Sequence, residues 1–455
     1  MIPKKFENLD ILVLLAGPGS GSKLFQGYLD GHSQILMTPG YILMHFYPHW
    51  DKHLVKEKNW KVILNKFLKL HPSILDTSKM KGGDFLYNLG NKKKDKITID
   101  KKKFISKVLN FLSGEEINSK NFFLAIHLAY AKCIGENLSK KKILVYHMHV
   151  CWYLKKFCKD FGNIKIISMA RELKSNIPNR VVTLEKSNLI HLNPTDQIFF
   201  KTRSYKNIIF EDFYSLDFLK KFDKCEHRVI KHEDLLIRKY SVLKNLCKYI
   251  DIRFENILKK STANKIQWNY KHAKNVKLKD SVATHITKYN ANNFFRHELH
   301  WINYLSLTFN QKYKYNYNKK GFLFLNYFLT FLFISFPSKT ELKLFLDFFK
   351  LNFIVNFFKK LCLETNTKKL IFYENNAFYF HKWSNKYYPF KIINFLLKKK
   401  KNSNLFWISI YFLFKTLLFF AFPALIIFEY ISRILICYGV LAKILFRKRF
   451  FPIKL

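Results

Sequence analysis

The stretch that most constrains the fold runs from Ile11 to Asp30 and reads ILVLLAGPGSGSKLFQGYLD. Its first five residues form a continuous apolar run, which is typical of a strand covered on both faces. The glycine-rich turn that follows lets the backbone direct several N–H groups at one bound anion. From Ser22 apolar residues recur every three to four positions, which predicts a helix whose N-terminus points into the turn.

Two common nucleotide-binding patterns do not match this stretch. The P-loop pattern G-x-x-x-x-G-K-[ST] requires a glycine before Lys23 and a serine or threonine after it, whereas the chain has Ser22 and Leu24. The dinucleotide pattern G-x-G-x-x-G fails because Ser22 stands where the third glycine belongs. The turn is therefore either a simple connection or a phosphate loop of another kind.

The charge balance is strongly basic, with 79 Lys and Arg against 32 Asp and Glu in 455 residues, a net charge of +47. Such a balance commonly indicates nucleic acid or an anionic membrane surface as a partner. Because lysine is abundant together with asparagine, phenylalanine and isoleucine, we interpret it mainly as compositional bias that places lysines on a solvated surface. No nucleic-acid partner is expected.

The seven cysteines are scattered without C-x-x-C spacing, which predicts neither a disulfide framework nor a zinc site. The N-terminal residues MIPKKFENLD lead straight into the first strand without the apolar stretch of a signal peptide. We therefore expect a first domain that stays in a reducing cytosol and holds no metal.

A second informative region covers residues 142–180. Short apolar runs at Ile143 to Tyr146 and Ile164 to Ser168 predict two buried parallel strands, joined by a helix within residues 152–161. His147 and His149 stand at the end of the first strand, and Arg171 follows the second. Ligands of parallel sheets bind at the carboxyl ends of strands, and a guanidinium suits phosphate. Packing remains the simpler role for either histidine.

A third region covers residues 227–252. Val229 and Ile230 predict a strand, and apolar residues from Leu236 to Ile250 predict a helix after it. Glu233 and Asp234 lie between the two, where acidic side chains complement the helix dipole. Helix capping is the simpler role for this acidic pair. Further helices are expected at Trp50 to Leu70 and Asn121 to Lys132.

Taken together, the three regions resemble the sulfotransferase superfamily that uses 3′-phosphoadenylyl sulfate (PAPS). Gly17 to Phe25 is similar to the family's 5′-phosphosulfate loop, G-x-x-[RK]-S-G-T-T, and QGYLDGHSQI is similar to its following helix end and D-G-H-P turn. The strand before Arg171 resembles the 3′-phosphate element, and His232 to Leu235 resembles the Y-E-D-L element. The resemblance implies an α/β fold, with a P-loop-kinase-like central parallel sheet flanked by helices.

The resemblance also implies roles for individual residues. PAPS would be the co-substrate, with no metal, and its binding residues would be Gly17, Gly19, Ser20, Gly21, Ser22, Lys23, Arg171, Ser175 and Asn179. Asn179 stands where the family has serine, and Ser175 lies closer to Arg171. His149 matches the histidine of a T-H-L-P-like stretch that takes the acceptor's proton, and His147 is the second candidate.

One position departs from the family pattern. Gly19 stands where the loop usually carries Arg or Lys, the residue that contacts the bridging oxygen. Either Lys23 substitutes for that cation, together with backbone N–H groups of Gly19 to Lys23 and the helix dipole, or the chain is an inactive relative. Lys23 is therefore a third candidate catalytic residue.

Composition changes after about residue 318, which suggests a transferase-like domain at 1–318, an apolar and amphipathic linker at 319–403 and a membrane-associated helical hairpin at 404–455. Leu405 to Phe422 and Ala424 to Phe446 flank Pro423 and each approach the length of about 20 residues that spans a bilayer. Basic residues at 398–401 and 447–449 predict that both ends face the cytoplasm.

Two other arrangements of this all-α hydrophobic region stay open. Lys415, Glu429, Arg433 and Lys443 are costly at the bilayer centre, which favours helices lying in the plane of the membrane surface. A buried helical subdomain without a membrane is the third reading.

The sequence as a whole predicts a membrane-attached, cytosol-facing enzyme that transfers a sulfuryl group from PAPS to a hydroxyl of a glycan, glycolipid or other lipid-linked acceptor. The alternative is an inactive sulfotransferase-like membrane binding protein. A nucleotide-dependent kinase is disfavoured by the residues around Lys23. Oligomeric state is not indicated by any pattern.

Overall fold

The computed structural model of the protein describes residues 1–15, 20–40, 42–43, 46–79, 86, 89–92, 94–148, 153–162, 164–172, 176, 225–268, 294–305, 307–315 and scattered positions beyond, at 328–330, 332–333, 335–337, 339, 342, 346, 409–410, 413, 417, 431 and 453–454. The chain divides into two compact units. The first unit comprises Met1–Arg171, Ser215–Lys288 and Phe450–Leu455, and the second comprises Glu172–Tyr214 and Tyr289–Arg449.

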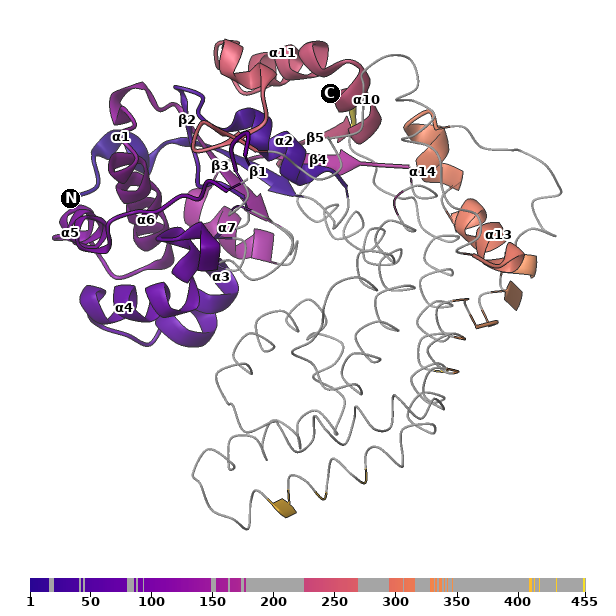
Figure 1. Cartoon of the computed structure of the whole chain (residues 1–455), viewed down its shortest axis with the longest axis horizontal. Coiled ribbons are helices and arrows are strands. Elements are labelled where there is room, and N and C mark those ends of the chain that lie inside the picture. The colour runs from indigo at the N-terminus through magenta and orange to yellow at the C-terminus, as the bar shows by residue number, and fades with distance from the viewer. Residues whose placement is uncertain are drawn as a thin grey trace. The chain divides into compact units, whose positions relative to one another are not determined.

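The first unit is built on a parallel sheet in which β1 is central (Figure 1). Its strand order is β2-β3-β1-β4-β5-β8, with β1 at Asp10–Leu15, β2 at Ile35–Leu36, β3 at Ile143–Met148, β4 at Ile164–Ala170, β5 at Glu226–Lys231 and β8 at Ile453–Lys454. All five pairings are parallel. The expected α/β fold with a central parallel sheet is therefore confirmed.

Strand β1 is buried on both faces, as its continuous apolar run predicts. Leu12 and Leu14 belong to one core cluster, together with Phe25 and Leu29 of α2 (Ser22–Leu29). Val13 and Leu15 belong to the other cluster, on the opposite face. We call these the α2-side core and the α6-side core.

Helices cover both faces of the sheet (Figure 1). The α2-side core includes residues of α2, α10 (His232–Ile237) and α11 (Lys239–Tyr249). The α6-side core is larger and includes residues of α1 (Lys4–Glu7), α3 (Phe46–His49), α4 (Trp60–Leu70), α5 (Lys101–Leu112), α6 (Ser119–Cys133) and α7 (Leu154–Phe161). Helix α6 is buried almost all round, because α5 and α7 pack against it.

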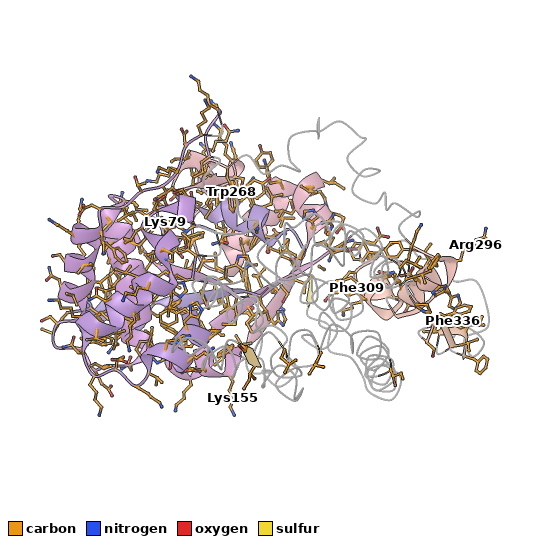
Figure 2. All side chains as sticks on the ribbon, turned by 60° about the horizontal axis from the view of Figure 1, so that its bottom comes forward. Lys79, Lys155, Trp268, Arg296, Phe309 and Phe336 are labelled. Atoms are coloured by element: carbon orange, nitrogen blue, oxygen red, sulfur yellow. The ribbon has the colours of Figure 1, made fainter. Side chains whose placement is uncertain are left out.

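A short hairpin, β6 (Thr262–Ala263) and β7 (Ile266–Gln267), lies beside α2. The buried carboxylate of Asp30, just after α2, accepts hydrogen bonds from Thr262 Oγ1 at 2.7 Å, Asn264 N at 3.0 Å and Lys265 N at 2.9 Å. Trp268, labelled in Figure 2, follows the hairpin and is buried in the α6-side core. The D-G-H turn after α2 thus anchors the C-terminal end of that helix.

Two expected helices are interrupted. Residues Trp50 to Leu70 do not form one helix: a π-helical turn at Trp50–Leu54 ends before α4, whose N-terminus is capped by Asn59 Oδ1 accepting from Lys61 N at 2.9 Å. The helix after β5 breaks at Arg238 into α10 and α11. The predicted helix at 121–132 is confirmed as α6.

In the second unit, α13 (Arg296–Leu305) is followed by α14 (Leu307–Lys312). The buried Glu298 accepts from Phe295 N at 2.8 Å and from Lys339 N at 2.9 Å, so it joins the start of α13 to the segment at 335–339. The apolar segments at 405–422 and 424–446 lie almost wholly outside the described residues. Among the helices that the structure does describe, none has the length and hydropathy needed to cross a bilayer.

Candidate functional site

The first motif places the N-terminus of α2 at the carboxyl end of β1. Gly21 is the residue before the helix and has a φ of +89°, a backbone conformation that favours glycine. Its carbonyl accepts the first helical hydrogen bond, from Phe25 N at 3.2 Å. Ser20 and Ser22 are buried, and Lys23 is half-buried in the first turn. N–H groups at such a helix start can bind an anion.

The third motif touches this turn directly. A Cβ atom added to Gly21 would lie 2.1 Å from Nδ1 and 2.6 Å from Cε1 of His232, the first residue of α10. The imidazole ring of His232 therefore lies against the backbone of the turn. His232 is half-buried as a residue, yet its Nδ1 is shielded from solvent and has no hydrogen-bond partner within the described part of the chain. A buried polar atom of this kind is suited to contact a polar ligand.

The second motif contributes Arg171, at the carboxyl end of β4. Arg171 directly follows this strand. Burial is the main cause that lowers the pKa of His232 to about 3, and the positive charge of Arg171 lowers it further. His232 is thus neutral at physiological pH and can offer Nδ1 as a donor or an acceptor. The ring of His232 thus packs against the first motif at Gly21 and lies within the electrostatic influence of Arg171 in the second motif.

Lys23 and Arg171 provide two cationic side chains at this site, in addition to the N-terminus of α2. Such a set suits a ligand with two separate anionic groups. Within the described residues, no group of three His, Cys, Asp or Glu side chains is placed to hold a metal ion.

His147 stands at the carboxyl end of β3, beside Leu14 of β1. Its side chain is buried, and Nδ1 lies 2.7 Å from Oε1 of Gln26, on α2. The Gln26 Nε2 donates to the backbone carbonyls of Thr38 at 3.1 Å and Gly40 at 2.8 Å. Helix α2 therefore follows the glycine-rich turn and also carries Gln26, the partner of His147.

Several predicted site residues cannot be placed. Gly17, Gly19, His149, Ser175 and Asn179 lie outside the described residues. Their roles stay predictions.

The acidic pair of the third motif has a structural partner on its own helix. Asp234 Oδ1 accepts from Arg238 Nη2 at 2.8 Å, one turn along, and both Glu233 and Asp234 are buried in the first turn of α10. Both carboxylates thus lie in the first helical turn, where acidic side chains complement the helix dipole, while a capping role for the pair stays a prediction. The side chain of this motif that contacts the glycine-rich turn is its first residue, His232.

Sequence reasoning missed two contacts, His232 with Gly21 and Gln26 with His147. The one signal for Gln26 was weak: a long amide side chain between the apolar Phe25 and Gly27 of the predicted helix. Nothing in the sequence indicated that His232 would face the turn, because the two positions are far apart along the chain.

Comparison with known proteins gives matches only at the level of structure. No protein-family model and no curated protein matches the sequence. The structure is similar to the sulfotransferase domain from the curacin biosynthetic pathway, with 16% identity, 68% of this chain and 99% of that chain covered, and a TM-score of 0.40. It is also similar to the sulfotransferase domain from the Synechococcus PCC 7002 olefin synthase, with 14% identity, coverages of 74% and 98%, and a TM-score of 0.33.

Proposed function

We propose that the protein transfers a sulfuryl group from PAPS to a hydroxyl group. The observation that carries this proposal is the meeting of Gly21, Arg171 and His232, which belong to three separate motifs of the sulfotransferase resemblance. A turn between a strand and a helix is common by itself. An arginine after β4 and a histidine after β5 near the same turn are less common, and they suggest a shared ligand or a shared structural role.

The donor would be held at its two anionic ends. The N-terminus of α2, with Ser20, Ser22 and Lys23, suits the 5′-phosphosulfate, and the guanidinium of Arg171 suits the 3′-phosphate. PAPS supplies a sulfuryl group attached to a phosphate leaving group. The ring of His232 fills the space that a Cβ on Gly21 would take, and its buried Nδ1 offers the donor a further polar contact.

The base proposed is His147, whose buried ring lies at the carboxyl end of β3 and contacts Gln26; His149, the other candidate, lies outside the described residues. During transfer the acceptor oxygen forms a bond to sulfur, the bond from sulfur to the phosphate oxygen breaks, and the hydroxyl proton passes to His147. The leaving adenosine 3′,5′-bisphosphate gains negative charge, which Lys23 and the helix N-terminus stabilise. Lys23 thereby supplies the positive charge that the family pattern has at the position of Gly19.

The acceptor proposed is a glycan, glycolipid or other lipid-linked hydroxyl at a membrane, with the first unit on the cytoplasmic side. Support comes from the second unit, where several of the described apolar side chains are exposed: Phe328, Leu332, Phe336, Leu342, Leu346, Leu413 and Leu417 (Figure 2 labels Phe336). Exposed apolar faces of this kind suit an interfacial or membrane contact.

Transfer of labelled sulfate from PAPS to a membrane lipid extract tests the function. We expect label in the extract with the wild-type chain and little with His147→Asn or Arg171→Ala, while Arg228→Ala, which loses an arginine elsewhere on the first unit, stays active. Absence of transfer by the wild-type chain, combined with tight binding of adenosine 3′,5′-bisphosphate, would instead favour the inactive binding protein.

Membrane attachment is tested separately by sedimentation with vesicles of phosphatidylcholine with or without phosphatidylserine. We expect binding that phosphatidylserine strengthens and that Leu413→Ser with Leu417→Ser weakens, whereas Val55→Ser, an exposed apolar residue of the first unit, has no effect. Alkaline extraction and protease protection then distinguish spanning helices from in-plane helices. A wild-type chain that ignores both kinds of vesicle contradicts the membrane proposal.

A further inference from the structure

The buried amide of Gln26 has only one chemically acceptable orientation. Its Nε2 lies 3.1 Å from the carbonyl oxygen of Thr38 and 2.8 Å from that of Gly40. Rotating the amide by 180° would set Oε1 against these two oxygens, which are acceptors like itself. Because the side chain is buried, water cannot compensate for such contacts. Oε1 of Gln26 must therefore face His147.

This orientation determines the proton position on His147. Oε1 is an acceptor, so the ring nitrogen 2.7 Å away, Nδ1, has to donate. In a neutral imidazole one nitrogen carries the proton and the other carries the lone pair. With the proton on Nδ1, the lone pair lies on Nε2, the nitrogen on the far side of the ring from Gln26.

We infer that Gln26 is a positioning residue that holds His147 in the Nδ1–H tautomer and so makes Nε2 the proton acceptor for the attacking hydroxyl. The inference deepens the proposed sulfuryl transfer and rests on it for the role of the proton acceptor. The tautomer itself follows from the hydrogen bonds alone.

The arrangement also links the base to the donor site. Gln26 lies one turn after Ser22, on the helix whose N-terminus forms the proposed phosphosulfate contact. Its two bonds to Thr38 and Gly40 hold the segment after β2 as well. A single helix thus sets the distance between the leaving phosphate and the base, which is the geometry an in-line transfer needs.

The test compares Gln26→Met with Gln34→Met in the full-length chain. Methionine has a similar length, and its thioether sulfur is only a weak hydrogen-bond acceptor for His147. Gln34 is the matched control because it is also a buried glutamine, and its Oε1 accepts from Arg253 N at 2.8 Å, away from His147.

The first readout is the tautomer of His147, from two-bond proton–nitrogen correlation spectra of the histidine rings near pH 8. The signal of His147 is the one lost in His147→Asn. We expect a protonated Nδ1 and an unprotonated Nε2 in the wild-type chain and in Gln34→Met, and a mixture of tautomers in Gln26→Met. A protonated Nε2 in the wild-type chain, or an unchanged spectrum in Gln26→Met, overturns the inference.

The second readout is kinetic. We expect Gln26→Met to lower kcat roughly 10- to 100-fold, less than the 10²–10⁴ that a whole general base contributes, with the KM for PAPS nearly unchanged. Gln34→Met should leave both values near wild type. Equal losses in the two variants would mean that Gln26 acts only through stability and would overturn the inference. If the wild-type chain shows the expected tautomer but transfers no sulfuryl group, the proposed function is overturned and the tautomer assignment remains valid.

Discussion

The imidazole of His232 occupies the space that a side chain on Gly21 would fill, with Nδ1 only 2.1 Å from where a Cβ atom would stand. The glycine at the start of α2 and the histidine at the start of α10 are thus mutually dependent. The neutral ring of His232 covers the turn at Gly21, and the positive charge of Arg171 acts on that ring.

Gly21→Ala should abolish binding of adenosine 3′,5′-bisphosphate and lower the free energy of unfolding. An alanine at positive φ alone costs about 1–2 kcal/mol, and the contact with His232 adds to this. Gly135→Ala is the matched control, because Gly135 also has a positive φ, +77°, but nothing lies within 4 Å of its added Cβ. Urea unfolding and calorimetric titration measure the two effects. Equal behaviour of the two alanine variants would contradict the close packing of His232, whereas His232→Ala should restore part of the stability of Gly21→Ala.

Lys23→Ala should lower sulfuryl transfer by roughly 10²–10³-fold, the usual effect of removing one stabilising donor of developing charge. The reason is that Lys23 is the cation nearest in sequence to the position where Gly19 replaces Arg or Lys. Lys155→Ala, which changes an exposed lysine on α7 (labelled in Figure 2), should have no effect. Full transfer by Lys23→Ala would show that this lysine does not compensate for Gly19.

His127 should make the first unit unstable in mild acid. It is fully buried on α6, its Nδ1 donates to the carbonyl of Phe123 at 2.8 Å, and burial lowers its pKa to about 4. Since an unfolded histidine titrates near 6.5, the unfolded chain binds the proton first. The contribution of neutral His127 to the free energy of unfolding is complete above pH 6.5. It is lost as the pH falls toward 4, by about 1.4 kcal/mol per pH unit.

The check is urea unfolding at several pH values between 7 and 4.5 for the wild-type chain and His127→Met. In the variant, the free energy of unfolding should change less steeply with pH, by an amount that corresponds to about one bound proton. The remaining slope is expected from other buried histidines, such as His227, whose pKa burial lowers to about 3. Identical slopes for the two chains would contradict the burial of His127.

Much of the local architecture could be predicted from the sequence because its causes are local. The apolar run at Ile11 to Leu15 is long enough only for a strand, and the change of periodicity at Ser22 marks the start of α2. The same holds for β3, α7 and β4, which form the expected β-α-β unit.

The arrangement between elements could not be predicted in the same way. β3 and β4 are consecutive strands of a β-α-β unit, yet β1 lies between them and pairs with both. The strand order depends on how completely each strand is covered on its two faces, and that coverage is a property of the whole sheet. The contact between Gln26 and His147 spans 121 residues, and no local pattern in either segment encodes it.

The most direct measurement compares the affinities of the wild-type chain and Arg171→Ala for adenosine 3′,5′-bisphosphate, AMP and ATP by calorimetric titration. If the three motifs form a PAPS site, the bisphosphate binds most tightly, and Arg171→Ala weakens it roughly 10- to 100-fold toward the affinity for AMP, as expected for a lost charged hydrogen bond of about 1.5–3 kcal/mol. Equal affinity for the bisphosphate and AMP, or preference for ATP, would contradict the account.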